Sequence, residues 1–248
     1  MPVEPFLAAL LPTLPLFPEV DDWPAYRAQS NAGADFLADQ VMEPGPEVKE
    51  RRTITIPVTG GAIDLNIYLP EGDGPHPAHL YLHGGGWVQG TLDTYDTLCR
   101  ELALACDAQV FSVGYRLSPE TRFPGAIVDS VRALRYLWDE AAAFGLDPAK
   151  IVVSGDSAGG HLAVTATRWL KAAGQPLPAG MALIYPVADR RLDSGSVKAF
   201  GEGFYLSRAQ MAWFWEQFLG DAPIAPTHPD LSPALADDLG GLPPSLVI

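Results

Sequence analysis

The chain is poor in cysteine. Only 2 of its 248 residues are cysteine, which excludes a small scaffold held together by many disulfides. Cys99 and Cys106 fall on one expected helix, about 10 Å apart along its axis, and this separation is too large for a disulfide between them. We therefore expect both thiols to be reduced and packed against neighbouring side chains.

Positive charge and long hydrophobic runs are also scarce. Lys and Arg total 16 against 30 Asp and Glu, giving a formal net charge of -14, which argues against nucleic acid and anionic membrane surfaces as partners. The apolar stretch at residues 6–11 has no basic segment before it and is followed by Pro12 and Pro15. This pattern does not favour a signal peptide or a membrane span, so the cytoplasm is the default expectation.

The remaining composition predicts one compact α/β domain with a lid. Hydrophobic residues make up 48% of the chain, enough to bury a sizeable core. Alternating strand and helix patterns are typical of a mostly parallel sheet flanked by helices, with an antiparallel first hairpin. Strands are expected near residues 52–58, 63–69, 78–83, 108–114, 150–155, 180–186 and 245–248, and helices near 93–106, 125–143 and 158–173.

A glycine-rich turn presents one serine between a strand and a helix. A β-branched run at 150–154 leads into Gly155-Asp156-Ser157-Ala158-Gly159, and a helical pattern follows at 161–170. Ser157 thereby lies at a helix N-terminus, where free N–H groups and the helix dipole favour a developing anion. Ser157 is the candidate catalytic nucleophile, although a G-x-S-x-G pattern alone also arises by chance in a glycine-rich chain.

A second glycine-rich motif lies upstream, where an expected strand runs into His83-Gly84-Gly85-Gly86-Trp87. An ester under attack develops negative charge on its carbonyl oxygen, and N–H donors preset about 2.7–3.1 Å away stabilise that charge. We assign the N–H groups of Gly84, Gly85 and Ala158 to this oxyanion hole. His83 is expected to shape the loop by hydrogen bonding rather than to act as a base.

Three motifs carry a resemblance to a known family. HGGGW at 83–87, Gly-Tyr-Arg-Leu-Ser-Pro-Glu at 114–120 and GDSAGG at 155–160 occur in the order and spacing of the bacterial hormone-sensitive-lipase-like esterases, also called family IV of the α/β-hydrolase superfamily. The chain resembles that family from about residue 50 onward. The resemblance implies an α/β-hydrolase fold with a helical cap. It also implies a serine carboxylesterase that forms an acyl-enzyme on short or medium acyl esters without metal or cofactor.

The resemblance also implies a division of the chain into body and cap. Residues 1–45 are expected to form an N-terminal cap segment and residues 46–188 the α/β-hydrolase core. Residues 189–227 would add the cap helices, and residues 228–248 would return to the core and end in a late sheet strand.

Further site assignments follow from positions near these motifs. Trp87, Tyr115 and Trp213 are expected to bind substrate, although bracing of the site by Tyr115 and packing of cap against body by the aromatic residues around Trp213 are open alternatives. Asp156 is placed to accept hydrogen bonds from loop amides. Because Asp156 is adjacent to Ser157 in sequence, it is unsuited to orient a histidine on that serine. No His, Cys and Asp cluster has metal-ligand spacing.

In the family that the chain resembles, the catalytic aspartate follows the strand that Leu246-Val247-Ile248 would begin, and the histidine comes later still. The resemblance therefore implies a truncated chain that lacks the C-terminal strand and helices. Loss of triad members costs roughly 10⁴–10⁶ in turnover, so weak or absent activity is expected. A non-catalytic module that binds a small molecule is the alternative function. The bare apolar strand edge predicts self-association.

Residues already present offer few substitutes for the missing base. The histidines are His76, His79, His83, His161 and His228. His161 lies one helical turn after Ser157 and is expected to pack or hydrogen-bond. His228 lies in a loop that could approach the site, and it is retained as a replacement base.

Overall fold

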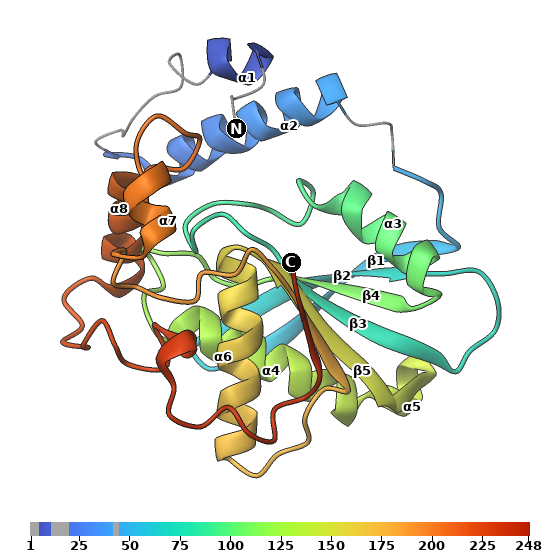
Figure 1. Ribbon diagram of the computed structural model, residues 1–248. Helices are drawn as coiled ribbons and strands as arrows, with labels where there is room; N and C mark the ends of the chain where they lie inside the picture. The colour runs from blue at the N-terminus through green and yellow to red at the C-terminus, as the bar shows by residue number, and fades with distance from the viewer. Residues whose placement is uncertain (1–4, 11–19, 42–44) are drawn as a thin grey trace.

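The computed structural model describes residues 5–10, 20–41 and 45–248. Its centre is a seven-stranded sheet of order β1-β2-β4-β3-β5-β6-β7, flanked by helices (Figure 1). The strands are β1 Glu50–Val58, β2 Gly61–Leu69, β3 His76–Leu82, β4 Gln109–Gly114, β5 Leu146–Asp156, β6 Gly180–Ile184 and β7 Ser245–Val247. The helices are α1 Pro5–Leu10, α2 Trp23–Val41, α3 Asp96–Cys106, α4 Gly125–Asp139, α5 Ala141–Phe144, α6 Ala158–Ala172, α7 Gly195–Phe200 and α8 Arg208–Leu219, with a 3-10 turn, η2, at Pro233–Leu235.

Strand pairing agrees with the expected α/β-hydrolase fold. β1 and β2 form an antiparallel hairpin, and β2 also pairs antiparallel with β4. The remaining pairs are all parallel, and helices α3, α4 and α6 lie in the connections between them. A mostly parallel sheet with an antiparallel first hairpin is therefore confirmed.

The sheet buries side chains on both faces. Leu80 and Leu82 belong to the larger core cluster with the residues of α4 and α6, whereas Tyr81 between them belongs to a second cluster with Cys99 and Ala103 of α3. Successive side chains of a strand point to opposite faces. The sheet is thus covered by α4 and α6 on one face and by α3 on the other (Figure 1).

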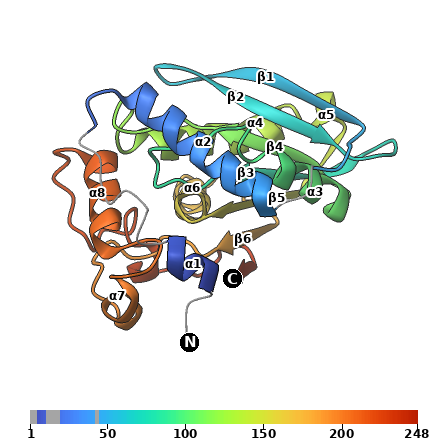
Figure 2. The same ribbon diagram turned by 90° about the horizontal axis from the view of Figure 1, so that it is seen from above.

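Strand register brings two loops together at the carboxyl edge of the sheet. Leu82 at the end of β3 pairs with Gly155 of β5, and Asp156 pairs with Ile184 of β6. The loop after β3 and the turn after β5 are therefore neighbours at the edge where parallel sheets bind ligands. Helix α2 crosses above this edge with α8 beside it (Figure 2).

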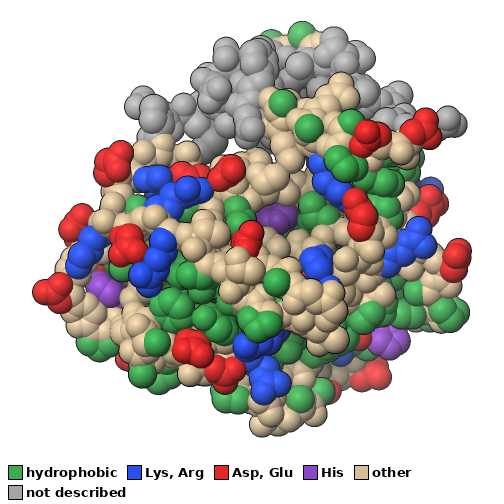
Figure 3. Space-filling view, turned by 180° about the vertical axis from the view of Figure 1, so that it is seen from behind, with side chains coloured by type: hydrophobic (Ala, Val, Ile, Leu, Met, Phe, Trp, Pro, Cys, Tyr) green, Lys and Arg blue, Asp and Glu red, His purple; other side chains and the backbone are tan. Residues whose placement is uncertain are grey.

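The surface and the last strand test further expectations. Acidic and basic side chains are interspersed over the face seen in Figure 3, so the negative net charge is not gathered into one patch there.

β7 is an edge strand whose apolar residues Leu246 and Val247 are exposed, and self-association through it stays a prediction. Within the described ranges, no helix combines the length and apolar character needed to cross a bilayer.

Both cysteines lie on α3, as expected. Cys99 is a buried free thiol and Cys106 an exposed one. The expectation that Cys106 is packed is therefore wrong. It is the last residue of α3, where the helix ends and fewer neighbouring residues can cover a side chain.

Three buried histidines, His79, His83 and His161, make stability depend on pH, because burial lowers the pKa of each. Burial lowers the pKa of His79 and of His161 to about 4, whereas an unfolded histidine has a pKa near 6.5. The unfolded chain binds more protons than the folded one between these values. Folded stability is therefore complete above pH 6.5 and is lost as the pH falls toward 4. From pH 7 to pH 5 we expect the free energy of unfolding to drop by about 2 kcal/mol for each of His79 and His161, measured by urea denaturation.

Substitution controls assign this pH dependence. His79→Leu should remove about 2 kcal/mol of the drop, while His76→Gln, at a half-buried position at the start of β3, should leave it unchanged. Equal unfolding free energies at pH 7 and pH 5 would contradict the burial of neutral imidazoles.

Candidate active site

Ser157 occupies a strained turn between β5 and α6. Its φ of 52° and ψ of -116° lie in a region that non-glycine residues seldom adopt, so surrounding contacts must hold it there. The Ser157 N–H donates to Ile184 O at 2.9 Å, and the Val187 N–H donates to Ser157 O at 3.2 Å. The backbone N–H and C=O of Ser157 are therefore both hydrogen-bonded to the chain at the end of β6 and just after it.

The glycines around Ser157 allow strand and helix to approach closely. A Cβ at either Gly155 or Gly159 would collide with the carbonyl oxygen of Leu82 in β3. Small residues are thus required on both sides of the serine. The G-x-S-x-G pattern reflects this packing and is not a chance occurrence.

The first glycine of the upstream motif has a different role from the expected one. The Gly84 N–H donates to Asp156 Oδ1 at 2.9 Å and lies 3.1 Å from the Tyr95 hydroxyl. A Cβ at this position would fall on the Asp156 carboxylate. The assignment of Gly84 to the oxyanion hole is therefore wrong, because its N–H is already bound inside the protein.

The next peptide units are oriented by the chain that follows them. Gly85 O accepts hydrogen bonds from Val88 N at 3.1 Å and from Gln89 N at 3.0 Å. Gly85 C=O and Gly86 N–H belong to one planar trans peptide and point in opposite directions. Fixing the carbonyl of Gly85 thus fixes the direction of the Gly86 N–H.

Three N–H groups remain as candidate oxyanion donors. Within the described ranges, the N–H groups of Gly85, Gly86 and Ala158 have no hydrogen-bond acceptor. Ala158 is the first residue of α6, where amides have no partner inside the helix. Gly85 and Ala158 stay candidates from the sequence, and Gly86 takes the place of Gly84.

Asp156 joins the serine turn to the glycine loop. Its carboxylate accepts from Tyr81 Oη at 2.8 Å and Gly84 N at 2.9 Å through Oδ1, and from Tyr95 Oη at 3.0 Å through Oδ2. Burial, reinforced by the adjacent Asp156 charge, raises the pKa of both tyrosines, so each stays a protonated donor. The expected contact of Asp156 with a loop amide is present.

Sequence reasoning missed the two tyrosine donors. Alternation along β3 places Tyr81 on the face opposite Leu80 and Leu82, which is a signal that the sequence contains. Tyr95 comes from the loop before α3, and nothing in its sequence context indicates the hydrogen bond to Asp156.

His83 and Tyr115 form a stacked pair behind the glycine loop. Their ring centroids are 4.3 Å apart, and the Tyr115 hydroxyl donates to His83 O at 2.8 Å. His83 Nδ1 lies 2.7 Å from Gly84 O, and burial lowers the pKa of His83. Tyr115 is only 2% exposed, so it braces the loop. The expectation that it touches substrate is wrong.

Trp87 is fully buried against helix α8. Its ring packs 4.3 Å from that of Trp215 and 4.5 Å from that of Phe218. The expectation that Trp87 binds substrate is therefore wrong. Instead, the buried ring of Trp87 packs against α8 and holds that helix next to the glycine loop.

Two other aromatic residues of α8, Trp213 and Phe214, have different neighbours. Trp213 is half-buried and stacks on Trp23 of α2 with ring centroids 5.9 Å apart. Its contact with substrate stays a prediction. A Cβ at Gly86 would fall in the ring of Phe214, so Phe214 covers a candidate oxyanion donor.

No histidine side chain in the described ranges forms a hydrogen bond with the Ser157 hydroxyl, although the His161 N–H donates to Ser157 O at 3.1 Å within the first turn of α6. His161 is fully buried, and its Nε2 lies 2.8 Å from Asp230 O. His228 Nδ1 accepts from Asp230 N at 3.2 Å, in a loop bound to both His161 and Arg168 of α6. His161 thus packs as expected, and the hydrogen bond of the His228 ring is made within its own loop.

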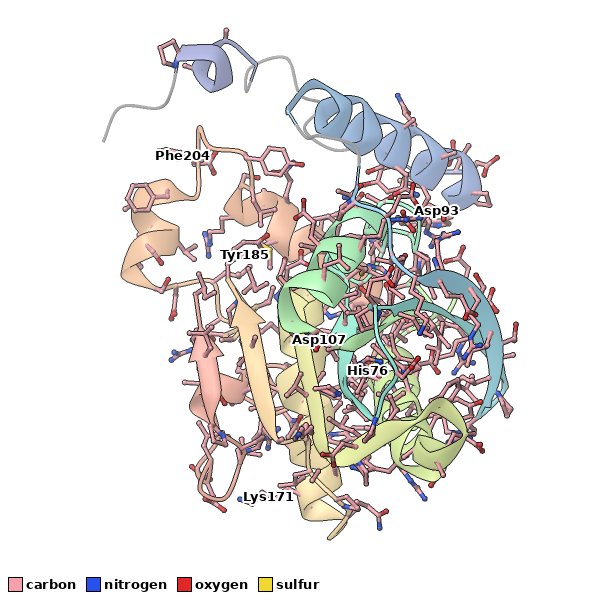
Figure 4. All side chains as sticks on the ribbon, turned by 90° about the vertical axis from the view of Figure 1, so that its right-hand side faces the viewer. His76, Asp93, Asp107, Lys171, Tyr185 and Phe204 are labelled. Carbon is pink, nitrogen blue, oxygen red and sulfur yellow. The ribbon has the colours of Figure 1, made fainter. Side chains whose placement is uncertain are left out.

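The open side of the site lies between the sheet and the cap. Tyr185 follows the end of β6 and is 66% exposed; it lies below the cap residue Phe204, whereas Lys171 marks the far edge of the molecule (Figure 4). Among the described residues, no group of three or more His, Cys, Asp or Glu side chains is placed to hold a metal ion.

Comparisons with known proteins fit this geometry. The α/β-hydrolase fold family matches residues 79–248. The chain belongs to this family. It is 37% identical over 233 residues to the carboxylic ester hydrolase LipN of Mycobacterium tuberculosis, covering 92% of this chain and 60% of the relative. It is 38% identical over 193 residues to the ethyl acetate hydrolase of Pseudomonas putida, covering 76% of this chain and 60% of the relative.

Solved structures agree with the family assignment. The hyperthermophilic esterase of Pyrobaculum calidifontis superposes with a TM-score of 0.87 at 35% identity, covering 100% of this chain and 79% of that one. The carboxylesterase EstE1, cloned from a metagenomic library, gives 0.83 at 38% identity, covering 92% and 77%. The resemblance to α/β-hydrolase carboxylesterases is confirmed. The chain spans about 60% of the length of LipN and of the ethyl acetate hydrolase.

Substitution of Gly86 tests the packing over the oxyanion loop. Gly86→Ala combines a φ of +59° with a collision against Phe214, so we expect loss of folded stability and at least a 100-fold slower acylation of Ser157, on the order of the loss of one oxyanion donor. The measurements are thermal denaturation and the rate of adduct formation with p-nitrophenyl butyrate.

Gly174→Ala is the matched control, because Gly174 has a φ of +62° and nothing within 4 Å of an added Cβ. It should cost about 1–2 kcal/mol for the backbone alone and leave acylation unchanged. Adding Phe214→Ala to Gly86→Ala should restore stability in part. If Gly86→Ala and Gly174→Ala showed the same stability and the same acylation rate, the contact between Gly86 and Phe214 would be refuted.

Proposed function

We propose that this protein is a serine carboxylic-ester hydrolase in which Ser157 is the nucleophile. The observation that supports this most is the placement of Ser157 on a strained turn, next to the free N–H of Ala158 and the glycine loop that carries Gly85 and Gly86. The names of the relatives, which are esterases and ester hydrolases, point to the same reaction.

In the proposed reaction, Ser157 Oγ attacks the ester carbonyl carbon and the carbonyl π electrons move onto the oxygen. Gly85, Gly86 and Ala158 donate hydrogen bonds to this oxyanion. The tetrahedral intermediate then expels the alcohol, which leaves with the proton that a base has removed from Ser157 Oγ, and an acyl-Ser157 ester remains. Water hydrolyses that ester by the same steps, releasing the acid and restoring the serine.

The proton of Ser157 needs a base. A serine hydroxyl is a poor nucleophile at neutral pH until a base removes its proton, and none of the described histidines hydrogen-bonds to it. We therefore expect the 248 residues alone to turn over slowly, roughly 10⁴-fold or more below a complete triad.

The substrate class that fits best is a short or medium acyl ester. Phe214 lies against Gly86 of the oxyanion loop, and the neighbouring Trp213 contacts Trp23 of α2, so an aromatic side chain lies directly beside one candidate donor. Two relatives are named ethyl acetate hydrolase and acetyl-hydrolase, which refer to small acyl groups. Tyr185 is exposed at the other side of the serine turn and is placed to contact the substrate.

Covalent labelling tests the proposal. After incubation with p-nitrophenyl butyrate, intact mass and peptide mapping should find a butyryl adduct on Ser157 that is missing in Ser157→Ala. Ser245→Ala, which removes an exposed serine of β7, should label like the unmodified protein. Added imidazole, a mobile base, should increase turnover of the unmodified protein and not that of Ser157→Ala.

Two outcomes would contradict the proposal. Equal ester cleavage by the protein and Ser157→Ala would exclude the serine as nucleophile. Saturable ester binding without any adduct, with or without imidazole, would favour the non-catalytic binding module.

A further inference from the structure

One face of the cap helix α2 is bound to the chain that follows the glycine loop. Tyr26 Oη and Ser30 Oγ both donate to Gln89 Oε1, at 3.0 Å and 2.8 Å. Asn31 Oδ1 accepts from Gly90 N at 3.3 Å. Tyr26 and Ser30 are one helical turn apart and so share a face, which makes this a docked helix rather than a loosely placed one.

Arg27 is the strongest link on that face. Its side chain is 16% exposed, with Nε donating to Val88 O at 2.6 Å and Nη2 donating to Ser118 O at 2.8 Å. Its guanidinium also pairs with Glu120, where Nη1 donates to Oε1 at 2.7 Å. The planar guanidinium of arginine can donate to two carbonyl oxygens and a carboxylate at once, and the ammonium group of lysine cannot reproduce this geometry.

These contacts connect two segments of the body. Ser118 N donates to Trp87 O at 2.8 Å, so the segments that Arg27 bridges also contact each other. Arg27 thus ties the cap to the residues after the glycine loop and to the segment that carries Ser118 and Glu120.

The route from Arg27 to the candidate oxyanion donors is short. Arg27 holds the carbonyl of Val88, and the N–H groups of Val88 and Gln89 hold Gly85 O. The Gly86 N–H lies in the same peptide as Gly85 O. Because glycine permits many backbone conformations, this peptide is free to turn unless Val88 and Gln89 are themselves fixed.

We propose that Arg27 of the cap helix is a positioning residue that fixes the Gly85–Gly86 peptide as an oxyanion donor. The proposal rests on the proposed function for its catalytic consequence. It predicts that cap docking and formation of the oxyanion hole are one event: when α2 leaves, the donor peptide loses its orientation.

The first readout needs no catalysis. Hydrogen–deuterium exchange of the peptide spanning residues 83–90 should be about tenfold faster in Arg27→Gln than in the unmodified protein, as expected for loss of hydrogen bonds to a charged group. Arg132→Gln is the matched control, since Arg132 also bonds a backbone carbonyl, Pro57 O, and a carboxylate, Asp139. It should leave exchange of this peptide unchanged.

The second readout separates positioning from a loss of folding. Acylation of Ser157, measured with imidazole present, is compared for an ester and for its thionoester, whose sulfur accepts hydrogen bonds poorly. Arg27→Gln should slow the oxygen ester about 10- to 100-fold and change the thionoester little. A purely structural defect would slow both alike.

Two further variants keep the test decisive. Glu120→Gln leaves the bonds from Arg27 to Val88 and Ser118 in place and should behave like the unmodified protein. If Arg27→Gln does not fold, Arg27→Lys takes its place, because lysine keeps the positive charge but lacks the planar guanidinium. It should show the same increase in exchange and the same selective slowing of the oxygen ester, each to a smaller extent.

Each outcome decides the matter. Unchanged exchange at residues 83–90, or parallel slowing of both esters, would overturn the role of Arg27. If Ser157 is never acylated in the unmodified protein, the proposed function fails, and the exchange result alone decides whether Arg27 orders the loop.

Discussion

The carboxylate of Asp156 holds the two halves of the candidate site together. It sits next to Ser157 in sequence, yet its oxygens bind the hydroxyls of Tyr81 and Tyr95 and the N–H of Gly84. A buried carboxylate is costly unless its acceptors are filled. If these partners moved away, the buried carboxylate of Asp156 would lose its hydrogen bonds, and the free energy of the folded state would rise. The glycine loop therefore stays against the serine turn.

The glycine loop has further contacts on both of its sides. From the body side, His83 stacks on Tyr115, whose hydroxyl binds the His83 carbonyl. From the cap side, α2 binds residues 88–90. A segment made largely of glycine, with little preference of its own, is thus held in one conformation by neighbours on both sides.

Much of the fold could be predicted from the sequence, because hydrophobic periodicity and glycine-rich turns are local signals. The glycine-rich turns indicate Ser157 as the candidate nucleophile for the same reason. Orientation and burial are not local signals. A triple glycine shows that the amides are bare but not which one is already bonded, so the sequence wrongly indicates Gly84 as a donor. Proximity to the motif does not show that the rings of Trp87 and Tyr115 turn into the core, so the sequence wrongly indicates both as substrate contacts.

The central claim is that hydrogen bonds to Asp156 fasten the glycine loop to the serine turn, and a double-mutant cycle on the free energy of unfolding tests it most directly. Asp156→Asn and Tyr95→Phe, alone and combined, should show a coupling free energy of about 1 kcal/mol or more, whereas Asp156→Asn combined with Tyr136→Phe should be additive. A coupling near zero between Asp156 and Tyr95 would contradict the claim.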